Sequence, residues 1–363
     1  MTAANHSRGS AELSDMAKEL VTRLQVHIPL VPRPFLALAD ELGLSEAQII
    51  DQTQALVESR IVRQIGAIFD GRALGYGSSL VAAKCTPGIL EQAAAVISSH
   101  PGVSHNYQRD HDFNLWYTIA VPPGRSLAEE VGFLHRLSGA QSTRLLPAIR
   151  MFKLGVKLDM DQSPGDTRTT DDGPADDGAE IRAAETPPTA AEIPAVQAFQ
   201  EPFPIIARPF DRAAGLHGFP SAEALLEVGE ELRRRMALRR FSAVLRHREA
   251  GFKANGMVVW KASPAECLRA GPLMATFAKV SHCYQRPTFD DWPYSLFTMI
   301  HGRTSEEVQE CIAALQNVTG LSEYRVLYSS VEYKKARVRY FTDQWDVWRR
   351  EAERSTAACG KAR

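Results

Sequence analysis

Val103-Ser104-His105-Asn106-Tyr107-Gln108-Arg109 returns 177 residues later as Val280-Ser281-His282-Cys283-Tyr284-Gln285-Arg286. A second pair of similar stretches, 28–35 and 203–210, has an offset of 175. Offsets that stay nearly constant along a chain indicate duplication with small insertions. The 363 residues therefore contain two homologous halves, which we expect at 12–158 and 196–345.

A segment of different composition separates these halves. Residues 159–192 contain ten acidic and two basic side chains, four prolines and no aromatic residue. Such a segment buries too little apolar surface to offset the entropy of ordering, so we expect a disordered acidic linker over 159–195. Because the whole chain has a net charge of −1, the remainder has a net charge of about +7, which suits a polyanionic ligand.

The spacing of apolar residues predicts the same order of elements in both halves. Helices at 16–25, 34–42 and 45–57 form a helix-turn-helix pattern. They precede strands at 61–69, 76–84, 103–111, 113–121 and 143–154, with helices at 88–98 and 126–137. The predicted fold is α+β and duplicated, each half a winged helix-turn-helix followed by a ferredoxin-like βαββαβ domain. The expected boundaries are 12–60, 61–158, 159–195, 196–237 (a degenerate helix-turn-helix) and 238–345.

The repeated stretch predicts a polar sheet face in each half. Side chains alternate along a strand, which places His105, Tyr107, Arg109 and His111 on one side. The second half repeats the pattern with His282, Tyr284 and Arg286. A solvated face is the alternative, although tyrosine and histidine are poor choices for solubility alone. A guanidinium, a phenol and an imidazole side by side can bind carboxylates and move protons.

A cationic stretch precedes this face in the second half. Residues 239–248 contain four arginines and one histidine, whereas the matching stretch 63–72 keeps only Arg63 and Arg72. We interpret it as an anion clamp, and an edge strand charged against aggregation is the alternative. Alternation puts His247 on the side of Arg239 and Phe241. Arg240, Arg246 and Arg248 lie on the other side of the strand. We expect the His247 side to face the ligand.

Several function classes are disfavoured. The helix that would read DNA, 45–58, carries three acidic residues and no lysine or arginine, which argues against DNA binding. The five cysteines are dispersed and form no CxxC pair, so we expect a cytoplasmic protein without a metal site. We find no apolar run long enough for a membrane span. We expect Trp345 and Trp348 to have a packing role, and Cys283 to point away from the His282 face.

These motifs resemble those of the siroheme decarboxylases, a family related to the Lrp/AsnC proteins. In the first half the resemblance rests on 102–109, His111 and 114–116. In the second half it rests on 239–248, 255–260 and 282–286. The second half resembles the companion subunit type, so the chain is similar to the fused two-half NirDL type. The resemblance covers nearly everything except the linker and the termini.

The resemblance implies an activity and a set of site residues. Members of the family remove CO₂ from the C12 and C18 acetates of siroheme in haem d1 biosynthesis, without an organic cofactor, and the iron belongs to the substrate. The implied catalytic residues are His105, His282, Tyr107, Tyr284 and His111. The implied substrate-binding residues are Arg63, Arg109, Arg239, Arg240, Arg246, His247, Arg248, Arg286 and Trp260. Phe241 or Trp260 would lie beside the reacting acetate.

Other points stay open at the level of sequence. The second half has no counterpart of His111, and the first half lacks the Arg246-His247 pair. One site is therefore expected to be stronger, and the sequence does not decide which half turns over substrate. A transcriptional regulator and a non-catalytic tetrapyrrole carrier are the competing functions. We expect siroheme as ligand and an intramolecular pseudo-dimer. Companion subunits and a homo-oligomer are left open.

Overall fold

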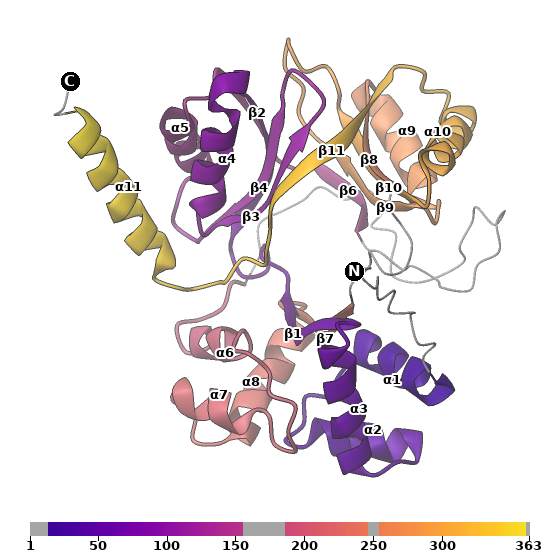
Figure 1. Ribbon diagram of the computed structural model, residues 1–363, viewed down its shortest axis with the longest axis vertical. Coiled ribbons are helices and arrows are strands. Elements are labelled where there is room, and N and C mark those ends of the chain that lie inside the picture. The colour runs from indigo at the N-terminus through magenta and orange to yellow at the C-terminus, as the bar shows by residue number, and fades with distance from the viewer. Residues whose placement is uncertain (1–13, 155–185, 246–253, 361–363) are drawn as a thin grey trace, which may run out of the picture. The chain divides into compact units, whose positions relative to one another are not determined.

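The computed structural model describes residues 14–154, 186–245 and 254–360, and it divides the chain into two compact units. Unit 1 comprises 1–70 and 189–246, and unit 2 comprises 71–188 and 247–363. Each unit thus takes a part from both halves of the duplicated sequence (Figure 1). None of the helices in the described ranges is long and apolar enough to cross a membrane.

Unit 1 contains the helices of both halves that were expected to form helix-turn-helix motifs. Its elements are α1 (Asp15–Val26), α2 (Pro34–Leu42), α3 (Glu46–Glu58), α6 (Ile193–Ala198), α7 (Asp211–Leu216) and α8 (Ala222–Arg234). Gly43 ends α2 with a φ of +66°, a conformation that glycine adopts without strain. Ser45 then caps α3 through a reciprocal pair of hydrogen bonds with Gln48. The first predicted helix-turn-helix is confirmed in these three helices.

A two-stranded ribbon completes unit 1. Strand β1 (Val62–Phe69) pairs antiparallel with β7 (Leu238–Leu245). We expected these strands to begin the ferredoxin-like domains at 61 and 238, but they pair with each other instead. The reason is packing, because Phe241 of β7 is 2 % exposed and its ring lies against Phe199, Phe203 and Phe210 of the same unit.

The described end of the expected linker belongs to this unit as well. Residues 155–185 lie outside the described part of the chain. Helix α6 already begins at Ile193, and Glu192 accepts hydrogen bonds from Thr189 and from the guanidinium of Arg235. The ordered second half therefore starts several residues earlier than expected.

Unit 2 contains two βαββαβ repeats, as predicted. The first consists of β2 (Gly77–Lys84), α4 (Leu90–Ser99), β3 (Val103–Arg109), β4 (Leu115–Val121), α5 (Leu127–Ser138) and β5 (Ser142–Leu146), with a short 3₁₀ turn, η1 (Pro87–Ile89). The second consists of β8 (Ala254–Trp260), α9 (Pro264–Ala275), β9 (Val280–Gln285), β10 (Leu296–Gly302), α10 (Ser305–Thr319) and β11 (Tyr324–Lys335). Figure 1 shows α4 and α5 beside the strands of the first repeat and α9 and α10 beside those of the second.

The two repeats exchange strands and share one sheet. The predicted strand 143–154 is interrupted before Pro147, which has no N–H to donate, and continues as β6 (Arg150–Leu154) beside β9 of the other repeat. In return, β11 pairs first with β8 and then with β3. The result is a nine-stranded sheet in the order β5-β2-β4-β3-β11-β8-β10-β9-β6. This arrangement agrees with the expected intramolecular pseudo-dimer.

Three cores stabilise unit 2. Two of them lie between the strands and the helices of each repeat. The third joins the repeats on the helix-free side of the sheet, where Trp116 and Leu146 of the first repeat meet Trp292 and Leu327 of the second. We call this side the inner face. Burial of such large apolar side chains is the main force holding the repeats together.

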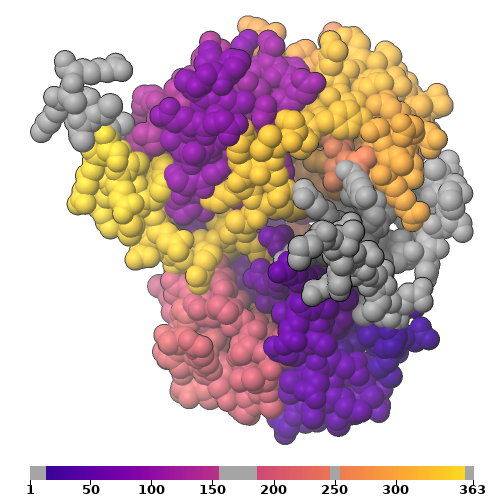
Figure 2. Space-filling model, viewed as in Figure 1, coloured from indigo at the N-terminus to yellow at the C-terminus, as the bar shows by residue number. Residues whose placement is uncertain are grey.

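The C-terminal segment covers the first repeat. Helix α11 (Gln344–Gly360) carries Trp345 in its first turn. This side chain is 4 % exposed and packs edge-on against His100, with 4.3 Å between the ring centroids. The ring centroid of Trp348 lies 4.4 Å from that of the same imidazole. Figure 2 shows this segment, in yellow, against the purple surface of the first repeat. The expected packing role of the two tryptophans is confirmed.

Candidate active site

Strands β3 and β9 present the predicted polar side chains on the inner face. Asn106 of β3 points to the opposite side, since its amide donates to the carbonyl of Ala94 in α4 at 3.1 Å. Cys283 of β9 is fully buried among the helices of the second repeat. Because neighbours along a strand alternate, His105 and Tyr107 share the face away from the helices, as do His282 and Tyr284. The predicted alternation is confirmed in both repeats.

The two sets have nearly the same geometry. The ring centroids of His105 and Tyr107 are 6.1 Å apart, and those of His282 and Tyr284 are 6.2 Å apart. The guanidinium carbon of Arg109 lies 5.7 Å from the Tyr107 ring, and that of Arg286 lies 4.9 Å from the Tyr284 ring. We call these the first set (His105, Tyr107, Arg109) and the second set (His282, Tyr284, Arg286).

The two arginines each bind a carbonyl of the opposite repeat. Arg109 donates from Nη1 to the carbonyl of Leu327, and Arg286 donates from Nη1 to the carbonyl of Leu146. Burial lowers the pKa of each guanidinium to about 10, so both stay charged at neutral pH. Their Nε atoms are buried and have no hydrogen-bond partner among the described residues. At least one N–H of each guanidinium therefore has no partner among the described residues.

His282 lies in a strongly perturbing environment. Burial, followed by the charges of His301, Arg286, His105 and Lys153, lowers its pKa to about 4. The imidazole is therefore neutral at pH 7 in the ligand-free protein. His105 of the first set is among these charges, and both sets belong to unit 2. A polyanion bound between them would favour the protonated form of His282.

His111 departs from the predicted pattern. Strand β3 ends at Arg109, and the chain turns, with the amide of His111 donating to the carbonyl of Arg109. The Nδ1 atom of His111 accepts a hydrogen bond from the amide of Phe113 at 3.0 Å, so its proton is on Nε2. Its ring lies 5.3 Å from Trp292, and burial lowers its pKa. His111 is thus beside the inner core rather than in line with His105.

Two aromatic residues predicted at the site lie elsewhere. Trp260 is fully buried on the helix side of β8, where its Nε1 donates to Thr298 Oγ1 at 3.0 Å. Phe241 is enclosed by the phenylalanines of unit 1. The expectation that either ring lies beside the reacting acetate was wrong, because both side chains have become core residues.

The predicted anion clamp is only partly described. Arg63, Arg239 and Arg240 are exposed on the ribbon of unit 1, a different compact unit from the two sets. Arg239 is paired with Asp70 at 2.8 Å. Three further predicted residues, Arg246, His247 and Arg248, lie outside the described residues. Their roles remain predictions.

Residues not predicted from the sequence also touch the histidines. Ser104 Oγ lies 2.9 Å from Nδ1 of His105, and Ser281 Oγ lies 2.7 Å from Nδ1 of His282. Both serines occupy the same position of the repeated stretch, and this repetition could have identified them as site residues. Ser281 also contacts His301, for which the repeat gave no signal.

Family models match most of the described parts. The AsnC-like ligand binding domain matches residues 73–153 and 249–334, that is, both repeats of unit 2. The siroheme decarboxylase NirDL-like HTH domain matches residues 17–63, close to the expected 12–60.

Characterised relatives match over nearly the whole chain. The siroheme decarboxylase of Hydrogenobacter thermophilus is 41% identical over 90% of this chain and 96% of its own length. The siroheme decarboxylase NirDL subunit of Paracoccus denitrificans is 31% identical over 88% of this chain and 95% of its own. A crystal structure of the siroheme decarboxylase NirDL with an iron-uroporphyrin III analogue covers 94% of this chain, with a TM-score of 0.75 and 34% identity. The fold, the paired sets and these similarities together show that the chain belongs to the siroheme decarboxylase family.

Proposed function

We propose that this chain is a carbon-carbon lyase that removes the C12 and C18 acetate carboxyls of siroheme. The product would be didecarboxysiroheme, an intermediate of haem d1 biosynthesis. The observation that carries the proposal is the pair of His-Tyr-Arg sets on the inner face, each with a buried, unpartnered guanidinium N–H. Similarity to a NirDL structure holding an iron-uroporphyrin III analogue supports a tetrapyrrole as substrate.

The arginines are suited to the carboxylates of the substrate. Siroheme carries eight carboxylates, and a charge-assisted bond from guanidinium to carboxylate is both strong and directional. The free Nε atoms of Arg109 and Arg286 supply one such donor in each repeat. Because both side chains are held by carbonyl groups of the opposite repeat, their orientation is fixed before the ligand arrives.

The histidines are suited to proton transfer. Each decarboxylation breaks a C–C bond, leaves its electron pair on the macrocycle and consumes one proton to form the methyl group. His282 is neutral in the free protein, and carboxylates of a bound substrate raise its pKa toward neutrality, where an imidazole is an effective acid. The macrocycle accepts the electron pair, so the proposal requires no organic cofactor, and the iron belongs to the substrate.

The cellular setting is part of the proposal. Four of the five cysteines, Cys85, Cys267, Cys283 and Cys311, are free and buried, as expected for a reducing compartment, and we place the protein in the cytoplasm. The Paracoccus denitrificans relative is named a subunit, so a companion decarboxylase subunit is a candidate partner. An activity assay of this chain alone, with and without such a partner, decides whether it is required.

Anaerobic incubation with siroheme and mass analysis of the product tests the function. Loss of two CO₂ is the expected result. Binding of siroheme with unchanged mass would make the protein a carrier. Absence of binding would favour the transcriptional regulator, which α3 already disfavours because it carries Glu46, Asp51 and Glu58 and no basic residue.

A further inference from the structure

Ser281 joins two imidazoles on the inner face of the second repeat. Its Oγ lies 2.7 Å from Nδ1 of His282 and 2.6 Å from Nε2 of His301. The carbonyl of Met299 is also a neighbour, but at 3.4 Å it is a much weaker acceptor. The hydroxyl can therefore accept a proton from one imidazole while it donates its own to the other.

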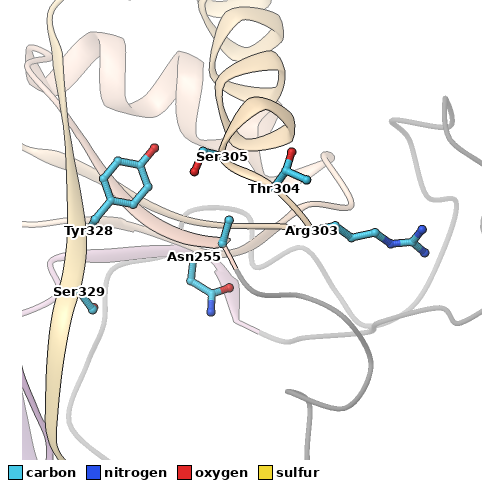
Figure 3. Close-up of a pocket in the computed structure, with 7 residues that line it drawn as sticks. Asn255, Arg303, Thr304, Ser305, Tyr328 and Ser329 are labelled. Carbon is cyan, nitrogen blue, oxygen red and sulfur yellow. The ribbon is translucent and has the colours of Figure 1, made fainter. Parts of the chain in front are cut away.

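The second imidazole leads toward the surface. His301 Nδ1 lies 2.6 Å from Oδ1 of Asn255, which orients the ring so that Nε2 faces Ser281. Asn255 is exposed and lines a cavity of about 290 Å³, whereas Ser281 is 3 % exposed. Figure 3 shows this cavity, with Tyr328 and Ser329 from β11 and with Arg303, Thr304 and Ser305 at the start of α10. The chain of contacts runs from the exposed Asn255 through His301 and Ser281 to the half-buried His282.

The first repeat provides an internal comparison. Asn255 pairs with His301 in the register of β8 and β10, and the same register in β2 and β4 pairs Ser78 with Ala120. Ser104 contacts His105 just as Ser281 contacts His282. However, Ala120 has no group that can exchange a proton, so the first repeat cannot continue the chain beyond Ser104. Both repeats thus have the contact between serine and histidine, and only the second continues it to another imidazole.

The reaction of the proposed function requires such a connection. One proton is consumed for each CO₂ released, and a macrocycle bound on the inner face would cover His282 from that side. His282 is neutral before the substrate binds and so cannot hold a proton in reserve. The charged groups that act on it are His301, Arg286, His105 and Lys153, and of these His301 is linked to it through the serine.

We propose that Ser281 and His301 form a proton relay that carries solvent protons to His282 and makes the second repeat the decarboxylating half. Protonated His301 gives the proton on Nε2 to Ser281 Oγ, whose own proton passes to Nδ1 of His282. The proton on Nε2 of His282 forms the new C–H bond as the C–C bond breaks and CO₂ leaves. Tautomer exchange moves the remaining proton of His301 from Nδ1 to Nε2, Nδ1 then takes up another proton from solvent, and tautomer exchange of His282 completes the reset of the relay. This inference rests on the proposed function.

The test removes each link of the relay in the full-length protein. We expect Ser281→Ala and His301→Gln to lower the rate of CO₂ release by roughly 10²-fold, while the affinity for siroheme, from absorbance titration, stays unchanged. Ser281→Thr keeps the hydroxyl and should retain most of the rate. Ser138→Ala removes a buried hydroxyl of α5, far from both sets in the fold, and should behave as the parent protein.

Two further measurements separate a relay from a structural role. Added imidazole should restore part of the rate to His301→Gly, and ¹⁵N NMR of His282 should show a changed tautomer population in Ser281→Ala. Parent-like turnover in both Ser281→Ala and His301→Gln would overturn the relay, and so would an equal loss in Ser281→Thr. A loss in Ser104→Ala as large as in Ser281→Ala would overturn the assignment to the second repeat. If the parent protein itself leaves the mass of siroheme unchanged, the proposed function fails instead.

Discussion

The guanidinium of Arg109 donates to the carbonyl oxygen of Leu327 at 2.6 Å, and the register of the sheet makes this bond one of a symmetric pair. Leu327 lies opposite Met257 in the second repeat, as Leu146 lies opposite Leu80 in the first. Arg286 donates to that same Leu146. Each repeat therefore binds the last strand of the other repeat, β5 or β11, through an arginine of its own candidate site.

The first prediction concerns this pair of bonds. Arg109→Met keeps the length of the side chain but leaves the Leu327 carbonyl without its donor, so the free energy of unfolding should fall by about 1.5 to 3 kcal/mol. Urea unfolding measures the change. Arg136→Met, at an exposed position of α5, is the control and should change stability by less than about 0.5 kcal/mol. Equal stabilities of the two variants would show that Arg109 serves only the ligand.

The second prediction separates the two sets by their histidines. His282→Ala should lower the rate of decarboxylation by about 10² to 10⁴-fold and change siroheme affinity little, because a general acid acts in the transition state. His105→Ala is the matched variant in the first set and should have a smaller effect. Single-turnover assays with siroheme measure both. Equal losses would mean two working sites, and no loss in either would remove the proton-donor assignment.

The third prediction follows from the lowered pKa of His282. Its ordinary value is 6.5 and its folded value is about 4, so between these pH values the unfolded chain binds a proton that the folded protein does not. Stability contributed by the neutral imidazole is therefore complete above about pH 6.5 and falls as the pH falls toward 4. At pH 5 the loss should be about 2 kcal/mol relative to pH 7. Urea unfolding at both pH values measures this loss. The free energy of unfolding of His282→Gln should fall by about 2 kcal/mol less than that of the parent protein between pH 7 and pH 5. Identical pH dependence in the parent and variant would contradict the shift.

The fourth prediction concerns a close contact between the repeats. A Cβ atom at Gly271 of α9 would lie 2.5 Å from the ring of Phe152, which β6 of the first repeat inserts into the core of the second. Gly271→Ala should therefore destabilise the protein, although alanine is favoured over glycine in a helix by about 1 kcal/mol. A Cβ atom at Gly132 of α5 would meet only the flexible end of Arg136, at 3.7 Å, so Gly132→Ala is the control, with a small gain expected in thermal denaturation. A gain in both variants would show that Phe152 moves aside freely.

The fifth prediction concerns the acidic segment. If it is only a tether, a version of the protein expressed as two chains, with the break between residues 159 and 185, should reassemble and copurify. The paired strands β6 with β9 and β11 with β3 provide the reason, since each chain completes the sheet of the other. A version in which the second chain also ends after Ser329 loses the strand beside β3 and should copurify poorly. Failure of the first version to copurify would give the segment a structural role.

Local patterns in the sequence were sufficient for part of this structure. Alternation along a strand depends only on neighbouring residues, so the common face of His105 and Tyr107 could be predicted, as could the capped helix after Ser45. Which side of a sheet becomes buried depends on partners distant in the chain. For that reason Trp260 and Phe241 were assigned to the site although both pack in cores. His301 was missed because its counterpart in the repeat is alanine.

The strand β11 contacts both repeats, through Tyr324–Tyr328 on β8 and through Ser329–Lys335 on β3. Strand β6 of the first repeat pairs with β9 of the second, so each repeat adds a strand to the four of the other. A repeat whose site no longer catalysed the reaction would still be needed to support the sheet, so selection would retain it. Substitutions on its polar face would then be tolerated. The duplication thus permits one half to specialise in proton transfer and the other in holding the macrocycle, with neither half dispensable.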